Sequence, residues 1–208
     1  PAGFPGTTLE KAVKLFSELG LKSVSMHGQL PVGEMVGQAI EAAQAVGVKY
    51  IISGKGPADF QTVDAIKKTA DIFNEAAANA ARHGLKIGYH NHDWEMLMVD
   101  GRPGYSILKE HLSKDVIFEL DTYWITVGGL KAPDLIEEMG GRSPVLHMKD
   151  GPCVKGEPMT AVGGGKMDFA PIIKAAKHAE ALIVELDFCA TDMLEAVKKS
   201  IQYLSSKI

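Results

Sequence analysis

The chain has 208 residues, of which 46% are hydrophobic and 23% charged, so it is long enough to bury a sizeable core without disulfides or metal. Its 22 Lys and Arg against 26 Asp and Glu give a formal net charge of −4, which argues against a nucleic-acid-binding protein with a basic face. No apolar run suits a membrane span and two cysteines make no disulfide scaffold, so we expect a cytoplasmic protein, with an exported form left open because the chain begins without Met.

The predicted helices and strands alternate along the chain. Three helical stretches end at Gly20, Gly47 and Gly84, and an apolar run that is typical of a strand follows each of them. Glycine is common there because the residue after a helix often adopts a positive φ angle. Helices are predicted at residues 7–19, 33–46, 61–83, 104–112, 131–139, 168–179 and 191–206. Strands are predicted at residues 21–27, 48–53, 85–91, 116–121, 144–149 and 182–187.

Strict alternation at this spacing predicts right-handed βαβ units on a parallel sheet, which is either doubly wound or closed into a barrel. The glycine-rich turn of dinucleotide-binding folds is absent after the first strand. In a (β/α)8 barrel, the active site is built from residues at the C-terminal ends of the strands. The reactive residues of this chain gather at those ends, so the sequence favours a TIM-barrel type of α/β fold.

Imidazoles and one lysine occur at several predicted strand ends. His27 ends the first strand, where it is either a substrate contact or a rim histidine. His90 and His92 fall at the end of the third strand, and alternation places them on one side of it. His147 and Lys149 share a face of the fifth strand. These positions predict that the side chains meet at one rim of the barrel.

Carboxylates occur at the same ends. Asp121 closes the fourth strand, where it is either a site residue or the N-cap of the next segment. Glu185 and Asp187 close the last strand, Asp150 follows the fifth, and Glu95 lies just past the third. Mixed oxygen and nitrogen donors suit Mn²⁺, Mg²⁺, Co²⁺ or Zn²⁺. Such an ion would act as a Lewis acid on a carbonyl group while a nearby base moves a proton on the adjacent carbon.

Two further features carry weaker predictions. The run of Gly163, Gly164 and Gly165 before Lys166 either cradles an anion with backbone N–H groups or forms a flexible loop. The cysteines, Cys153 and Cys189, are expected to be ordinary thiols.

Four segments of the chain resemble, in this order, the xylose isomerase-like TIM-barrel superfamily, and in particular its sugar phosphate isomerase/epimerase-type members. The segments are residues 89–95, 120–124, 147–150 and 162–169. The resemblance implies one TIM-barrel domain over residues 1–208 that is N-terminally truncated, with six βα units visible and the first two strands missing. Residues 1–4 resemble the segment after the second strand. The two outermost strands would then have open edges, so we expect a homo-oligomer.

The resemblance also implies a divalent metal held by Glu, Asp, His and Glu at the ends of the last four strands. Asp121, His147 and Glu185 match the last three of these ligands. Where many members have the Glu of a Glu-Asn-His motif, this chain has His90. Either His90 replaces the missing ligand or Glu95 reaches the metal, and we prefer Glu95.

The remaining roles follow from the same resemblance and from the strand-end positions. Catalytic roles are predicted for His90, Lys149 and Glu185. Substrate contacts are predicted for His27, His92, Trp124 and Lys149.

The leading functional hypothesis is a metal-dependent isomerase or epimerase of a sugar, a sugar phosphate or a related polyol, in carbohydrate metabolism. A dehydratase of a keto-inositol or similar keto-sugar begins with the same proton abstraction and remains an alternative. The DNA-repair branch of the superfamily, similar to endonuclease IV, needs more His ligands and a basic DNA-binding face, which the net charge disfavours. A non-catalytic sugar-binding barrel is the third alternative.

Overall fold

The computed structural model describes residues 6–208, so the expectation for residues 1–4 lies outside the described residues. The chain divides into two compact units, and each is described by itself. The first unit contains residues 6–90 and 106–117, and the second contains residues 91–105 and 118–208. Three of the parallel strands in the described part of the chain belong to each unit, so the predicted alternation of helices and parallel strands is confirmed.

The first unit alternates helices and strands as predicted. Its helices are α1 (Leu9–Glu18), α2 (Val36–Val46) and α3 (Val63–Ala81), together with most of α4 (Gly104–His111), and its short 3-10 turns are η1 (Gly33–Met35) and η2 (Pro57–Phe60). Its strands are β1 (Ser25–His27), β2 (Tyr50–Ser53) and β3 (Lys86–His90). β2 pairs in parallel with both β1 and β3, and Ile51 is the partner of Met26 and of Ile87.

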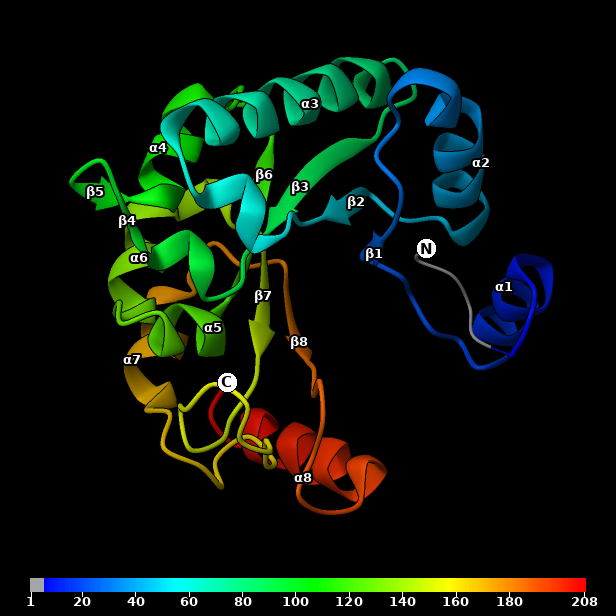
Figure 1. Ribbon diagram of the computed structural model, residues 1–208. Coiled ribbons are helices and arrows are strands. Elements are labelled where there is room, and N and C mark those ends of the chain that lie inside the picture. The colour runs from blue at the N-terminus through cyan, green and yellow to red at the C-terminus, as the bar shows by residue number, and fades with distance from the viewer. Residues whose placement is uncertain (1–5) are drawn as a thin grey trace. The chain divides into compact units, whose positions relative to one another are not determined.

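The long helix α3 covers β3 and supplies much of the core of this unit (Figure 1). Ile66, Ala70 and Phe73 lie on its buried face, as their spacing predicts. The ring of Phe73 packs against that of Tyr89, with centroids 4.9 Å apart. The glycines after α2 and between α3 and β3 have positive φ, 76° at Gly47 and 71° at Gly84, which confirms the turn that the sequence predicts.

Two asparagines of α3 tie the helix to other segments of the first unit. Asn74 donates a hydrogen bond to the carbonyl of His111 (2.9 Å) and accepts one from the backbone N–H of Ser113 (2.6 Å). Asn79 donates a single bond to the carbonyl of Pro31 (2.9 Å). Asn74 therefore satisfies two backbone groups, whereas Asn79 satisfies one.

We expect Asn74→Ala to lower the free energy of unfolding by about 2 kcal/mol, because it leaves one backbone donor and one backbone acceptor without their hydrogen-bond partner. Asn79→Ala, a matched change on the same helix, should cost about 1 kcal/mol. Urea denaturation followed by circular dichroism measures both values. Equal losses in the two variants would show that the Asn74 bonds do not hold the turn at residues 111–113.

The second unit contains the remaining elements. Its helices are α5 (Thr122–Val127), α6 (Ala132–Met139), α7 (Phe169–Ala175) and α8 (Met193–Ser205), with 3-10 turns η3 (Trp94–Met96) and η4 (Gly140–Arg142). Its parallel strands are β6 (Ile117–Asp121), β7 (Val145–Met148) and β8 (Ala181–Val184), and a small antiparallel hairpin joins β4 (Met98–Val99) to β5 (Arg102–Pro103). β7 pairs with β6 on one side and β8 on the other, and α8 lies beside β8 (Figure 1).

The structure corrects three details of the predicted elements. The strand after Gly84 ends at His90, so His92 lies beyond it and the argument from strand alternation does not place His92. The last strand ends at Val184, so Glu185 and Asp187 both follow it. The short helix α5 was not predicted, because its Thr, Tyr, Trp, Ile and Val residues favour strands and it depends on its Asp121 cap.

The helices formed by residues 6–208 are all too short or too polar to cross a bilayer.

Candidate functional site

The two oxygens of the Asp121 carboxylate make different contacts. Oδ1 accepts hydrogen bonds from the backbone N–H groups of Tyr123 (3.1 Å) and Trp124 (3.0 Å) and so caps α5. Oδ2 lies 3.0 Å from the Lys149 ammonium group. Asn91 fixes the end of β6, since its Oδ1 accepts the Asp121 N–H at 2.9 Å. The N-cap role that the sequence offers for Asp121 is therefore confirmed, and its role as a site residue stays a prediction.

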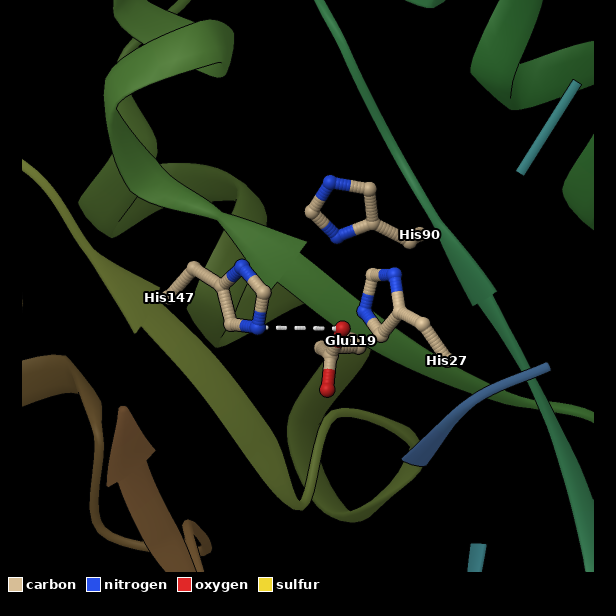
Figure 2. Close-up of side chains that lie close together, drawn as sticks. All are labelled: His27, His90, Glu119 and His147. Carbon is tan, nitrogen blue, oxygen red and sulfur yellow. Dashed lines mark ion pairs between the residues drawn. The ribbon is translucent and has the colours of Figure 1, made fainter. Parts of the chain in front are cut away.

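His147 lies next to Asp121 because the two residues are register partners on β7 and β6. Its Nδ1 is 2.6 Å from Glu185 Oε2 and 3.9 Å from Asp121 Oδ2. On the other side of the ring, Nε2 is 3.1 Å from Glu119 Oε2 (Figure 2). Thr122 fixes the backbone here by donating its hydroxyl proton to the His147 carbonyl at 2.9 Å. One edge of the imidazole thus faces two carboxylates, and the opposite edge is held by a third.

The surrounding carboxylates set the charge of His147. Burial lowers its pKa, but hydrogen bonds to Glu119 and Glu185 and the charges of both groups outweigh burial and raise the pKa to about 10. The reciprocal effect appears at Glu185, where burial raises the pKa while His147 and Lys149 hold it well below its usual range. A metal ion that binds His147 must therefore displace a proton.

Lys149 is a buried lysine surrounded by carboxylates. Its Nζ lies 3.0 Å from Asp121 Oδ2, 2.9 Å from Glu185 Oε2 and 2.9 Å from Asp187 Oδ2. It also lies 5.8 Å from the centre of the Trp124 ring. Burial lowers the pKa of Lys149, but the three carboxylates outweigh it and raise the pKa above its usual value. Lys149 therefore keeps its positive charge in this environment.

The donor atoms of Asp121, His147 and Glu185 could together hold a divalent metal ion. One donor atom of each lies within 4.8 Å of the others. Two ligands that are each about 2.1 Å from one ion are at most about 4.2 Å apart. The two distances from His147 Nδ1, 2.6 Å to Glu185 and 3.9 Å to Asp121, are within this limit, and the two carboxylate oxygens lie within 4.8 Å of one another. Two carboxylates and one imidazole leave coordination positions open for a substrate. Glu119 adds the carboxylate that commonly orients a ligating histidine.

The structure gives Glu95 a different set of contacts. Its carboxylate is fully buried, Oε2 accepts the backbone N–H of His92 at 2.8 Å, and Oε1 lies 3.8 Å from His92 Nδ1. Among the described residues, Glu95 is not part of the group formed by Asp121, His147 and Glu185. Its role as fourth ligand stays a prediction. His92 stacks on Trp94, with ring centroids 4.2 Å apart, and its substrate contact stays a prediction as well.

His27 and His90 meet each other in the first unit. Their rings form an edge-to-face pair with centroids 4.9 Å apart (Figure 2). His27 is exposed at the end of β1, whereas His90 is buried at the end of β3. Their assignments as substrate contact and catalytic residue stay predictions.

Glu119 is the residue of this site that sequence reasoning missed. A signal for it was available, because Glu119 and Asp121 lie two positions apart on β6 and therefore on one face of the strand. Asp187 was recognised as a strand-end acid but was given no role. In the structure both of its oxygens accept hydrogen bonds from Lys149, at 3.0 and 2.9 Å.

The glycine-rich loop after β7 wraps around a carboxylate of the protein itself. Buried Asp150 accepts hydrogen bonds from the backbone N–H groups of Gly151 (2.8 Å), Gly163 (2.9 Å), Gly165 (3.0 Å) and Met167 (3.1 Å). A Cβ on Gly165 would overlap Asp150 Oδ1. Of the two readings of the loop, the anion cradle is the one that the structure shows, and the anion is Asp150.

The family model of the xylose isomerase-like TIM barrel matches residues 7–207. None of the curated proteins matches this chain.

Three solved structures illustrate the similarity. A sugar phosphate isomerase/epimerase from Parabacteroides distasonis is 24% identical, with a TM-score of 0.81 over 98% of this chain and 83% of the other. The IolI protein with a bound zinc atom is 16% identical, with a TM-score of 0.70 over 98% and 84%. A probable 3-DHS dehydratase from Bacillus anthracis is 12% identical, with a TM-score of 0.68 over 94% and 81%. At these identities the structures show the fold, and they confirm the predicted TIM-barrel type.

Proposed function

Because this chain belongs to the xylose isomerase-like TIM-barrel family, we propose that it is a metal-dependent isomerase or epimerase of a sugar or sugar phosphate. The observation that carries the proposal is the convergence of one donor atom each from Asp121, His147 and Glu185. Asp121, His147 and Glu185 would hold the ion, and bound there it would supply Lewis-acid stabilisation of the negative charge that develops when a proton leaves the carbon next to a carbonyl group.

The residues of the chain supply the other parts of the reaction. Glu185 is the partly exposed member of the trio, with a side chain 38% accessible, so it is the one that a substrate reaches most directly. Its lowered pKa keeps the carboxylate ionised, and its basicity toward a substrate carbon would rise if its contacts with His147 and Lys149 were lost. The Lys149 ammonium would stabilise negative charge on the substrate oxygens, and the half-buried Trp124 ring beside it offers a surface for the sugar.

Proton transfer at carbon predicts exchange with solvent. Incubating the Mn²⁺-loaded protein with a panel of ketoses and ketose phosphates in heavy water should place deuterium on the carbon next to the carbonyl, which proton NMR detects as a lost signal. Asp121→Asn, which removes a metal ligand, should abolish the exchange. Turnover of a ketose without any deuterium in product or recovered substrate would contradict this proton-transfer scheme.

A dehydratase of a keto-sugar or keto-inositol is the second candidate. It shares the proton abstraction, and one structural neighbour of the chain is a probable 3-DHS dehydratase. It also needs an acid to protonate the departing hydroxide, and the carboxylates that raise the pKa of Lys149 make its ammonium a weak acid for this step. Mass spectrometry of the same reactions distinguishes the two activities, because a dehydratase releases a product that is lighter by one water.

A further inference from the structure

Lys149 contacts the same oxygen atoms that the proposed metal ion needs. We propose that the Lys149 ammonium competes with the divalent ion for Asp121 Oδ2 and Glu185 Oε2, and that Asp187 holds the ammonium when the ion binds. This inference rests on the proposed function, since it concerns the affinity of the same metal site.

The Lys149 ammonium and a divalent ion would occupy the same two carboxylate oxygens. Lys149 Nζ lies 3.0 Å from Asp121 Oδ2 and 2.9 Å from Glu185 Oε2, which are also the two oxygens that face Nδ1 of His147. A metal ion bound to both oxygens would therefore lie within a few ångströms of the ammonium group. Repulsion between a divalent and a monovalent cation at that distance is strong in a buried site, so one of the two must withdraw.

Asp187 provides a place for the displaced ammonium. Both of its oxygens contact Lys149 Nζ, at 3.0 and 2.9 Å, so this ion pair persists without help from the other two carboxylates. Asp187 is outside the group of potential metal donors found among the described residues. Its side chain is 37% accessible, whereas that of Asp121 is fully buried, so a lysine held by Asp187 alone is also better solvated.

The alternative role of Lys149 predicts the opposite effect on metal binding. If the ammonium served mainly to hold Asp121 and Glu185 together against their mutual repulsion, removing it would let the two carboxylates separate and weaken the site. If the ammonium competes, removing it frees both oxygens and strengthens metal binding. The sign of the change in metal affinity therefore distinguishes competition from simple structural support.

Calorimetric titration with Mn²⁺ at constant pH tests the proposal. Lys149→Met should bind Mn²⁺ about tenfold or more tightly than the wild-type protein, because the competing charge is gone. Asp187→Asn should weaken Mn²⁺ binding by roughly threefold or more, since the lysine loses its other partner. In the Lys149→Met background, Asp187→Asn should change the affinity by less than about twofold, because no ammonium remains to be held.

A matched control comes from a second Lys–Asp pair in the same unit. Lys155 Nζ lies 2.6 Å from Asp93 Oδ2 and contacts none of the three donor atoms, so Lys155→Met removes the same charge from a different loop. It should leave the Mn²⁺ affinity within about twofold of the wild-type value. Circular dichroism checks the fold of every variant, and Lys149→Gln replaces Lys149→Met if the latter does not fold.

The possible results distinguish a failure of the Lys149 competition from a failure of the proposed metal-dependent function. Unchanged or weaker Mn²⁺ binding by Lys149→Met, with binding lost in Asp121→Asn, would overturn the competition and leave the metal site intact. Absence of Mn²⁺ binding in both the wild-type protein and Lys149→Met would overturn the metal-dependent function and the competition together. Binding that appears only after Lys149 is replaced would support the competition in its strongest form.

Discussion

Asp150→Asn is expected to lower the free energy of unfolding by about 3–5 kcal/mol, more than any other single change considered for this protein. The Asp150 carboxylate accepts four backbone hydrogen bonds, and three of their donors belong to the loop at residues 163–167. Asparagine has one acceptor oxygen and an NH₂ group, which would face backbone N–H donors and leave them without acceptors in a buried site. Urea denaturation of the purified variant measures the loss.

Asp168→Asn provides the control for this prediction. Asp168 lies at the end of the same loop, is exposed, and accepts one backbone hydrogen bond, from Ala170 at 3.2 Å, as the N-cap of α7. Asparagine is an equally good N-cap, so the same substitution should cost less than about 0.5 kcal/mol here. If both variants lost similar stability, the Asp150 carboxylate would not be what organises the loop.

Asp121→Asn is expected to weaken Mn²⁺ binding by at least about 100-fold, because it removes a charged ligand from a site with three protein donors. The substitution leaves the cap of α5 in place, since asparagine caps helices as well as aspartate does. Glu119→Gln should have a smaller effect of about 10–100-fold, because Glu119 contacts His147 rather than the ion. Calorimetric titration with Mn²⁺ measures both affinities.

The same titration decides which residue is the fourth ligand. A larger loss of affinity in Glu95→Gln than in His90→Asn would assign the role to Glu95, and the reverse order would assign it to His90. An Asp121→Asn variant that folds normally and binds Mn²⁺ within a few-fold of the wild-type protein would contradict the site itself.

Much of the fold follows from local patterns in the sequence. The glycines that end α2 and α3 and the apolar runs that follow them placed β2 and β3 correctly within a few residues, because a positive φ angle and a buried strand each demand particular residue types. Strand-end positions also predicted that Asp121, His147 and Glu185 lie close together, and one donor atom of each lies within 4.8 Å of the others. Parallel strands in register bring such residues together, as the pairing of Asp121 with His147 shows.

The contacts around these residues depend on the tertiary structure. Sequence spacing gives the face of a strand on which a side chain lies, but it does not give the rotamer or the oxygen that meets a given cation. Only the folded chain showed that Asp121 caps a helix with one oxygen and contacts Lys149 with the other. It also showed that Glu95 accepts a hydrogen bond from the backbone N–H of His92, in its own loop.

The glycine-rich loop shows the same division. Three glycines before Lys166 left two possibilities open, a flexible loop or a cradle in which backbone N–H groups surround an anion, because residues without side chains permit both. The identity of the anion was decided by the fold, which places Asp150 at the end of β7 inside the loop. The sequence therefore determined which chemical groups meet at the strand ends. The tertiary structure decided which charges neutralise one another, because that depends on distances of a few ångströms between residues far apart in the chain.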